Sequence, residues 1–210
     1  ADMDSTMIGQ ECIDELADVA GVGDRVKEIT ARAMNGELGF EGALRERVAL
    51  LAGLDAGVVG EVLEARITDA PGGRTLVATM KAHGAHTLLV SGGFTAFSGP
   101  VAGRLGFDAH QANELGTEGG RLTGSVAEPI LGRDAKVAAL EAATGRLGIG
   151  AHDVVAVGDG ANDLGMLARA GMGVALHAKP AVAEQCELRV QHGDLTALLY
   201  LQGYAGDSFA

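Results

Sequence analysis

The apolar residues of this chain change their spacing near residue 70. Over residues 8–68 they recur every three or four positions, which is typical of α-helices with one buried side. This pattern predicts four short helices, over residues 13–20, 26–33, 40–51 and 59–66. Turns with glycine end the first three of them, at Gly21, at Asn35-Gly36 and near Gly53. Four short helices joined by brief turns indicate a small helical bundle.

Beyond Pro71-Gly72-Gly73, short apolar runs alternate with helical stretches. A helix over residues 74–82 leads into an apolar run at 87–90. The segments DVVAVGDGAND (153–163) and GMGVAL (171–176) each join a short buried strand to glycine turns. Strands that alternate with helices predict a parallel, doubly wound sheet. Residues 110–128 alternate in polarity and contain Gly119-Gly120, which predicts a β-hairpin.

These two patterns predict an α/β fold in two parts. We expect a Rossmann-like core with a doubly wound parallel sheet, made from residues 1–8 and 71–210. Residues 9–70 are expected to form a helical-bundle cap, inserted between the first strand and the rest of the sheet. The stretch DMDST reads as the end of a buried strand, although only Ala1 precedes it. We therefore expect either that an upstream segment is lacking from this sequence or that its first strand is missing.

Polar clusters stand where the predicted strands end. They are Asp2-Met3-Asp4-Ser5-Thr6, Ser91-Gly92-Gly93 and Gly158-Asp159-Gly160-Ala161-Asn162-Asp163. Lys136 lies near the start of a predicted helix between the last two clusters. Open α/β sheets bind their ligands beyond the carboxyl ends of the strands, so we expect all four features to face one crevice.

The residue types in these clusters suit metal and phosphate chemistry. A period of two along a strand puts the carboxylates of Asp2 and Asp4 on one face, where they repel each other unless a cation or a proton lies between them. Several carboxylates around one point favour a hard cation such as Mg²⁺. A serine with a glycine turn can hold phosphate oxygens, and Lys136 adds a positive charge. One aspartate is then free to attack phosphorus and another to move protons.

Taken singly, each cluster also has a plainer interpretation. Asp2 and Asp4 could lie in a solvated turn, and the 158–163 segment could simply cap a helix. Ser91-Gly92-Gly93 alone favours an ordinary turn, and a single lysine such as Lys136 is more often solvated. The order of all four along one chain favours the functional interpretation.

Five blocks, in this order, resemble the phosphoserine phosphatase family of the haloacid-dehalogenase-like hydrolases over nearly the whole chain. They are DMDSTMIGQECIDELA, GELGFEGALRERVALLAGL, LLVSGGF, ANEL with LTG, and VAVGDGANDLGMLARAGMGVAL. The resemblance implies hydrolysis of O-phospho-L-serine to L-serine and phosphate, in serine biosynthesis. It also implies an aspartyl-phosphate intermediate and Mg²⁺ as the cofactor.

The resemblance implies roles for residues of the core. Asp2 is the expected nucleophile, and Asp4 is the expected general acid and then base. The expected metal ligands are Asp2, the backbone carbonyl of Asp4, and Asp159, with Asp163 supporting them. The residues expected to bind or assist the phosphate are Ser91, Gly92, Lys136 and Asn162.

The resemblance also implies a substrate site in the cap. Glu11 is expected to pair with the substrate ammonium, Arg47 is expected to pair with its carboxylate, and Phe40 is expected to shield the site. Charged helix faces are usually just solvated, and Phe40 could equally be ordinary core of the cap. Arg45, two residues before Arg47, is expected to point elsewhere.

Two other functions fit parts of the pattern. One is a phosphatase or phosphotransferase for a related metabolite such as phosphothreonine or phosphohomoserine. The other is a phospho-receiver domain, in which a phosphorylated aspartate switches the binding of a partner protein. Against the receiver, Asp4 beside the phosphorylated residue would speed hydrolysis, and a receiver needs no cap that reads a substrate.

Composition narrows the choice of partners and compartment. The 210 residues carry a net charge of −12, which makes nucleic acid an unsuitable partner because phosphate binding needs clustered Lys and Arg. No apolar run has transmembrane length, so no membrane association is expected. The two cysteines lie far apart in the sequence, which favours reduced thiols in the cytoplasm. We expect a monomer or a homodimer.

Overall fold

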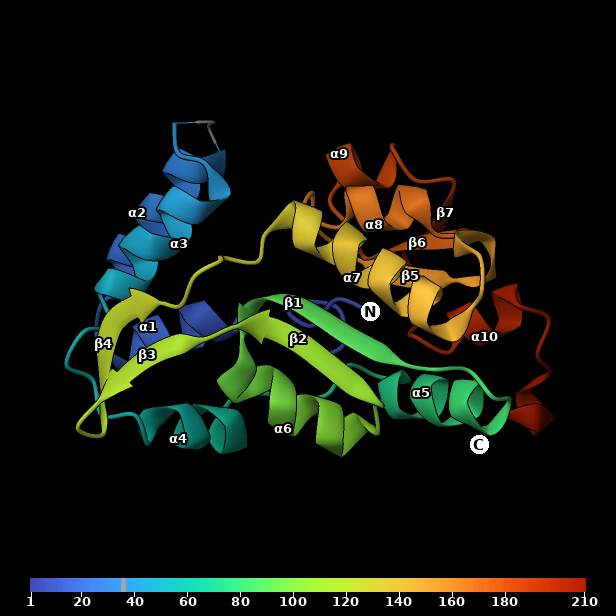
Figure 1. The fold of residues 1–210 in the computed structure, drawn as a ribbon, viewed down its shortest axis with the longest axis horizontal. Coiled ribbons are helices and arrows are strands. Elements are labelled where there is room, and N and C mark those ends of the chain that lie inside the picture. The colour runs from blue at the N-terminus through green and yellow to red at the C-terminus, as the bar shows by residue number, and fades with distance from the viewer. Residues whose placement is uncertain (35–36) are drawn as a thin grey trace.

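The computed structural model describes residues 1–34 and 37–210, with strands at its centre and helices around them (Figure 1). The strands are β1 (Leu88–Phe94), β2 (Ala109–Asn113), β3 (Leu115–Glu118), β4 (Arg121–Val126), β5 (Val155–Gly158), β6 (Met172–Leu176) and β7 (Leu188–Val190). The α-helices are α1 (Cys12–Val19), α2 (Gly23–Met34), α3 (Phe40–Ala49), α4 (Val58–Ala65), α5 (Gly73–Ala82), α6 (Thr95–Leu105), α7 (Arg133–Leu147), α8 (Leu164–Arg169), α9 (Pro180–Ala183) and α10 (Ala197–Leu201). Two 3₁₀ helices complete the fold, η1 (Ala151–Asp153) and η2 (Gly206–Ser208).

The central sheet is parallel and is joined through the first two residues of the chain. β1 pairs with β2 on one side, and β5, β6 and β7 form a parallel group on the other. Ala1 N donates to Leu88 O (2.8 Å), Val90 N donates to Ala1 O (2.8 Å), and Asp2 N donates to Val157 O (3.0 Å). Ala1 and Asp2 therefore occupy the position of a strand between β1 and β5.

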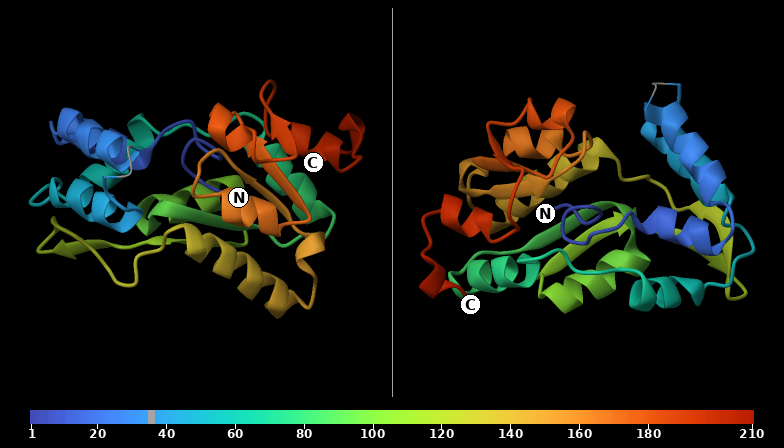
Figure 2. Two further views of the ribbon diagram at one scale, coloured as in Figure 1. Left: turned by 90° about the horizontal axis from the view of Figure 1, so that it is seen from above. Right: turned by 180° about the vertical axis from the view of Figure 1, so that it is seen from behind.

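Helices cover both faces of this sheet. α7 lies on one side of the strands, whereas α5 and α10 lie on the other (Figure 2). Fully buried apolar side chains fill the space between the layers, for example Leu89, Phe97 and Val174. Removing such surface from water is the main stabilising contribution, at roughly 25 cal/mol per Å². The predicted α/β fold with a doubly wound parallel sheet is confirmed.

The four predicted helices of the first third are present as α1–α4. α1 packs against α2 and α4, and α2 packs against α3. The chain leaves and rejoins the core at one place, because Gly9 N donates to Thr68 O (3.0 Å) and Ala70 N donates to Met7 O (2.9 Å). We propose on this ground that residues 9–70 form one inserted cap. The predicted turn at Asn35-Gly36 lies outside the described residues.

The predicted hairpin is present as β3 and β4, but it is shorter than expected. Its turn residues Gly119 and Gly120 have φ angles of 56° and 77°, which glycine adopts without strain. Residues 109–113 belong instead to β2, beside β1. The hairpin packs against α3. It also bonds to the segment that follows α3, since Gly53 N donates to Leu122 O (2.8 Å). Alternation of polarity predicts a strand but not its partner, and packing decided the partner here.

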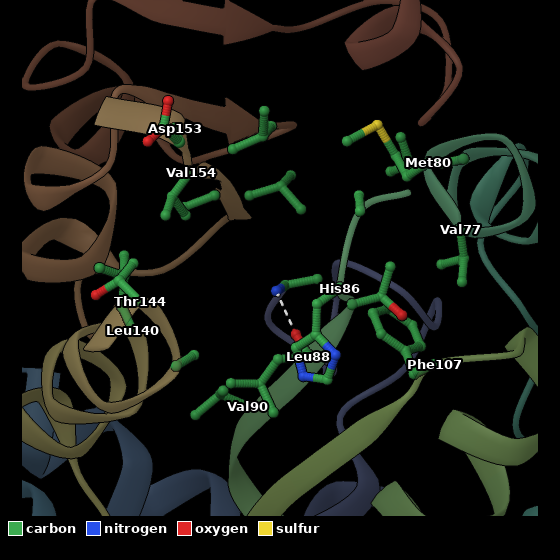
Figure 3. A pocket seen from close by; sticks show the side chains of 18 of the residues that line it. Val77, Met80, His86, Leu88, Val90, Phe107, Leu140, Thr144, Asp153 and Val154 are labelled. Carbon is green, nitrogen blue, oxygen red and sulfur yellow. Dashed lines mark hydrogen bonds between the residues drawn. The ribbon is translucent and has the colours of Figure 1, made fainter. Parts of the chain in front are cut away.

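A cavity of about 430 Å³ lies between β1 and β5 next to Ala1 (Figure 3). Its lining is mostly apolar and includes Leu88, Val90 and Val154. Apolar walls do not suit a phosphate group, so the candidate chemistry lies elsewhere, at the carboxyl ends of the strands. Among the described residues, no helix combines the length and apolar character needed to span a membrane.

Candidate active site

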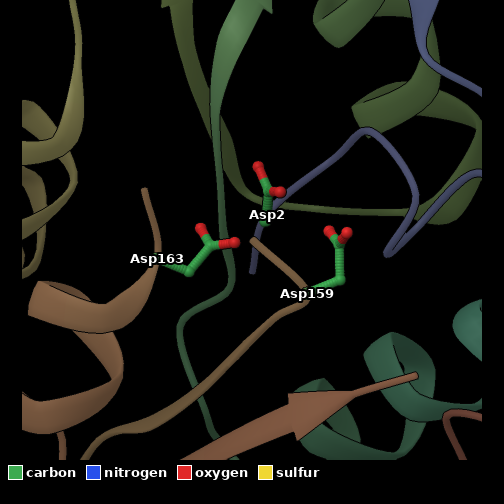
Figure 4. A group of neighbouring side chains, drawn as sticks. All are labelled: Asp2, Asp159 and Asp163. Atoms are coloured by element: carbon green, nitrogen blue, oxygen red, sulfur yellow. The ribbon is translucent and has the colours of Figure 1, made fainter. Parts of the chain in front are cut away.

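Three carboxylates converge at the carboxyl ends of the central strands (Figure 4). Asp2 follows the strand position of Ala1, Asp159 follows β5, and Asp163 immediately precedes α8. One oxygen of each carboxylate lies within 4.8 Å of one oxygen of each of the others. Gly158 permits this approach, since a Cβ there would lie 2.3 Å from Asp163 Cγ. The structure thus brings together two of the predicted clusters.

Lys136 on α7 joins this group from the other side. Its Nζ donates to Asp2 Oδ1 and to Asp163 Oδ1, each at 2.5 Å, and its side chain is almost fully buried. Burial acts to lower the pKa of Lys136, but the two carboxylates outweigh it and raise the pKa. Burial, with the Asp163 carboxylate, raises the pKa of Asp2 to about 8 even beside Lys136.

The charges of this cluster are not balanced by its own residues. Three carboxylates, those of Asp2, Asp159 and Asp163, lie close together, and the single ammonium of Lys136 contacts only Asp2 and Asp163. Buried like charges at this separation require a proton or a cation between them. Oxygen donors without sulfur or imidazole suit a hard divalent cation, so the residues present fit Mg²⁺.

Two further contacts fix the orientation of the carboxylates. Thr6 Oγ1 donates to Asp159 Oδ1 at 3.0 Å, and Gly160 N donates to Asp163 Oδ2 at 3.0 Å. Sequence reasoning assigned no role to Thr6, although the D-x-D-x-T spacing contained it. Hydrogen bonds of this kind hold potential metal ligands in one rotamer.

Asp4 contacts the start of α1 and the irregular part of β1 around Ser91. Its Oδ1 accepts from Cys12 N (3.0 Å) at the start of α1, and its Oδ2 accepts from Ser91 Oγ (3.3 Å). Burial raises the pKa of Asp4, against the opposing effect of these hydrogen bonds. Gly93 permits the contact, because a Cβ there would lie 2.7 Å from Asp4 Oδ2. Asp2 and Asp4 therefore have different partners although only Met3 separates them in the sequence.

The predicted cap residues Glu11 and Arg47 lie near Asp4. Glu11 accepts a hydrogen bond from Ser5 Oγ (2.7 Å), and Ser5 has a φ of 54°. Although the Glu11 side chain is solvent-accessible, protein crowds it from several sides, and this desolvation together with Asp4 raises its pKa to about 7. Burial lowers the pKa of Arg47, while the nearby charges of Asp14, Glu11 and Asp4 act against that change. Glu11 and Arg47, the two residues predicted to bind the charged groups of the substrate, are thus close enough for the charge of Glu11 to affect the pKa of Arg47.

Arg45 and Arg47 on α3 differ in exposure and in their contacts. Arg45 is exposed and pairs with Glu41 and Glu128, whereas Arg47 is half-buried and donates to Ala43 O at 3.2 Å. The expectation that Arg45 points elsewhere agrees with these contacts.

Phe40 connects the cap to the core. A Cβ added to Gly92 or to Gly132 would lie 3.2 Å from an atom of the Phe40 ring, so the ring lies directly on both backbones. Phe40 is 37% exposed, which is inconsistent with a residue in the interior of the cap. It closes one side of the space beside the predicted phosphate loop.

Asn162 stands beside Asp163 at the start of α8. It is half-buried, and its Oδ1 would lie 2.3 Å from a Cβ on Gly160. Within the described part of the chain its side chain makes no hydrogen bond with protein, so its amide is available at the rim of the site.

Comparison with known proteins agrees with this geometry. A family profile for haloacid dehalogenase-like hydrolases matches residues 1–168. A phosphoserine phosphatase of Streptomyces coelicolor is 48% identical over 203 residues, covering 96% of this chain and 49% of its own length. A phosphoserine phosphatase of a Polaromonas species is 43% identical and covers 95% of this chain and 87% of its own. This chain therefore spans about half the length of the first relative and most of the second.

A solved structure of similar fold extends the comparison to three dimensions. It is described as a phospho-aspartyl intermediate analogue of phosphoserine phosphatase, with 40% identity, a TM-score of 0.88, and coverage of 95% of both chains. The family match over four-fifths of the chain and the near-complete structural overlap lead to one conclusion. This chain belongs to the haloacid dehalogenase-like hydrolases, in the group that contains the phosphoserine phosphatases.

Proposed function

We propose that this protein is a Mg²⁺-dependent phosphatase that hydrolyses O-phospho-L-serine through an aspartyl-phosphate intermediate. The observation that carries the proposal is the separation of roles between Asp2 and Asp4. Asp2 lies against Lys136, whereas Asp4 accepts hydrogen bonds from Ser91 Oγ and Cys12 N. Two neighbouring carboxyl groups in unlike surroundings are suited to act as nucleophile and as acid.

Asp2, Asp159, Asp163 and the backbone carbonyl of Asp4 would hold the metal. When bound, Mg²⁺ supplies positive charge against the phosphoryl oxygens and the nucleophilic carboxylate. Lys136 keeps Asp2 in place and supports its ionised form, which is the form able to attack phosphorus.

The first half-reaction uses both aspartates. A carboxylate oxygen of Asp2 attacks phosphorus while the bond from phosphorus to the seryl oxygen breaks. Burial raises the pKa of Asp4, which favours its protonated form, and Asp4 gives its proton to that oxygen, so serine leaves as the alcohol. In the second half-reaction Asp4 takes a proton from water as the water oxygen attacks phosphorus. The bond from phosphorus to Asp2 then breaks and phosphate is released.

The charged residues of the cap are suited to bind a zwitterionic substrate. Glu11 and Arg47 present one charge of each sign near Asp4, to match an ammonium and a carboxylate. Phe40 lies over Gly92 and Gly132 and limits the access of water to the space between them.

The test is phosphate release from O-phospho-L-serine with Mg²⁺, with and without a chelator, beside phosphothreonine and an aryl phosphate. We expect a chelator-sensitive preference for phosphoserine. Asp2→Asn should abolish turnover, whereas the matched variant Asp207→Asn, at an exposed position, should not. An active Asp2→Asn enzyme contradicts the mechanism, and a long-lived phosphoaspartate without turnover favours a receiver instead.

Substrate choice is tested on the cap. Glu11→Gln and Arg47→Ala should lower kcat/KM for phosphoserine by about 10- to 100-fold and leave the aryl phosphate unchanged. Arg45→Ala is the matched control on the same helix, since Arg45 pairs away from the site. Equal losses on both substrates contradict the assignment of these two residues.

A further inference from the structure

Asn113 is a buried side chain whose amide joins two loops of the candidate site. It is the last residue of β2 and is 2% exposed. Its Nδ2 donates to Gly92 O (2.8 Å) and to Leu131 O (3.1 Å), and its Oδ1 accepts from Leu131 N (2.7 Å). Leu131 thus exchanges both backbone groups with the amide, as it would with a neighbouring strand. A buried amide with all these bonds fixes the distance between the two loops.

The first loop is the end of β1. The β1–β2 ladder is regular up to Val90 and resumes at Phe94, with a shift of register between them. Residues 91–93 therefore leave the ladder, and the Gly92 carbonyl bonds to the Asn113 side chain in place of a strand. The loop that sequence analysis assigned to phosphate binding is held in its bulged form by this contact.

The contact continues to the proposed general acid. The peptide unit that starts with the Gly92 carbonyl ends in the N–H of Gly93, which points the opposite way in a trans peptide. This N–H donates to Ser91 Oγ at 2.8 Å, and Ser91 Oγ donates to Asp4 Oδ2 at 3.3 Å. Asn113 therefore sets the orientation of the peptide that holds the Ser91 hydroxyl.

The second loop is the approach to α7. Leu131 precedes Gly132, the residue before the first turn of this helix, and Lys136 lies in that part of the helix. Lys136 in turn contacts Asp2 and Asp163. A displacement of Leu131 would move the start of α7 and, with it, the ammonium.

We infer that Asn113 is a positioning residue of the phosphate site. It holds the loop of Ser91 and Gly92 at a fixed distance from the helix that carries Lys136, so that both reach the same phosphoryl group. The role requires a group that donates twice and accepts once at this length, which among side chains is an asparagine amide. The inference rests on the proposed function, since it names a residue that supports the same site.

Two variants and one control test this role. Asn113→Ala removes the bridge, and Asn113→Leu removes it while keeping a branched side chain of similar size. Ser98→Ala is the control, because Ser98 is a buried residue whose hydroxyl bonds to His110 Nδ1 (2.9 Å) on the same strand β2. It removes a buried hydrogen bond to β2 without touching the site.

We expect both Asn113 variants to lose roughly 10- to 100-fold in kcat/KM, as is common for residues that orient site groups. The loss should be equal for phosphoserine and for an aryl phosphate, because the phosphoryl group is common to both. Inhibition by inorganic phosphate should weaken in the same proportion. Ser98→Ala should lower Tm and leave these values unchanged. In a Ser91→Ala background, Asn113→Ala should cost less than in the native chain, because the two residues act through one contact path.

Asn113 variants that fold and behave like Ser98→Ala overturn the inference, and so does a loss confined to phosphoserine. Should Asn113→Ala not fold, Asn113→Leu carries the test. A folded native chain that releases phosphate from neither substrate contradicts the proposed function instead. The rise in Tm on adding inorganic phosphate with Mg²⁺ then still tests Asn113, and an equal rise in the native and variant chains overturns its role.

Discussion

Thr6 Oγ1 donates a hydrogen bond of 3.0 Å to Asp159 Oδ1, and this contact joins residues 153 positions apart. It orients a carboxylate that we assign to the metal. Thr6→Val keeps the shape of the side chain but removes the donor, so the Mg²⁺ concentration for half-maximal activity should rise by roughly 10- to 100-fold. Thr6→Ser, which keeps the hydroxyl, should stay close to the native value. A magnesium titration of phosphate release measures both, and an unchanged Thr6→Val profile contradicts the role.

Lys136 is the only ammonium that the structure shows in contact with Asp2 and Asp163 in the described residues. Lys136→Met leaves these buried carboxylates without a counter-charge, which should destabilise the metal-free fold by about 3 to 5 kcal/mol. Mg²⁺ should restore part of the loss because it supplies positive charge at the same place. Denaturant unfolding with and without Mg²⁺ measures this, with Lys27→Met on the exposed face of α2 as control. Equal stability of the two variants would contradict the claim that Lys136 compensates the charge of the buried carboxylates.

Glu11 gives a pH dependence to substrate choice. Its pKa is raised from 4.5 to about 7, so the side chain is mostly neutral below pH 7 and ionised above it. Only the ionised form attracts the substrate ammonium. The ratio of kcat/KM for phosphoserine to that for an aryl phosphate should therefore rise as pH increases through about 7. Both substrates carry an ionisable phosphate group. The pH dependence that this group causes therefore largely cancels when the two kcat/KM values are divided.

Glu11→Gln supplies the control for this pH dependence. The ratio should become low and nearly flat with pH, and a native-like slope in this variant would assign the titration to another group. The stability effect has the opposite sign. Because the folded pKa lies above 4.5, Glu11 favours the fold at low pH and loses that contribution as pH rises through about 7. Without substrate, thermal unfolding should show the stability of Glu11→Gln rising relative to that of the native chain as pH increases from about 4.5 to about 7.

Gly93 allows Asp4 and Ser91 to meet. A Cβ at Gly93 would lie 2.7 Å from Asp4 Oδ2 and 3.1 Å from Ser91 Oγ, so Gly93→Ala must displace one of them. Misplacement of a reacting group by this amount costs on the order of 100-fold in kcat. Gly103→Ala is the matched control on α6, where an added Cβ meets nothing within 4 Å. That control should gain about 0.5 to 1 kcal/mol of stability and keep native kcat. An unaffected Gly93→Ala enzyme shows that the loop has room to move.

The sequence by itself determined the elements and the chemical character of the site. Apolar spacing predicted α1–α5 and the strands β1, β5 and β6 close to their observed places. These patterns are readable because amphipathic helices and buried strands repeat at periods fixed by backbone geometry. Carboxylates, a serine and a lysine at strand and helix ends similarly indicated metal and phosphate chemistry, and the ordered blocks indicated the family.

The sequence predicted that these clusters share one crevice, but only the tertiary structure decided which of their side chains are in contact. Lys136 contacts Asp2 across 134 positions and Asp163 across 27, and no local pattern carries those distances. The roles of Thr6 and Asn113 were equally invisible, since a hydroxyl and an amide acquire meaning only from the partner that packing brings to them. The pairing of β2 with β1 was also not predictable, because the alternating polarity of β2 was equally compatible with a place in the hairpin. Periodicity is a property of neighbouring residues along the chain, whereas pairing and contact depend on the packing of the whole fold.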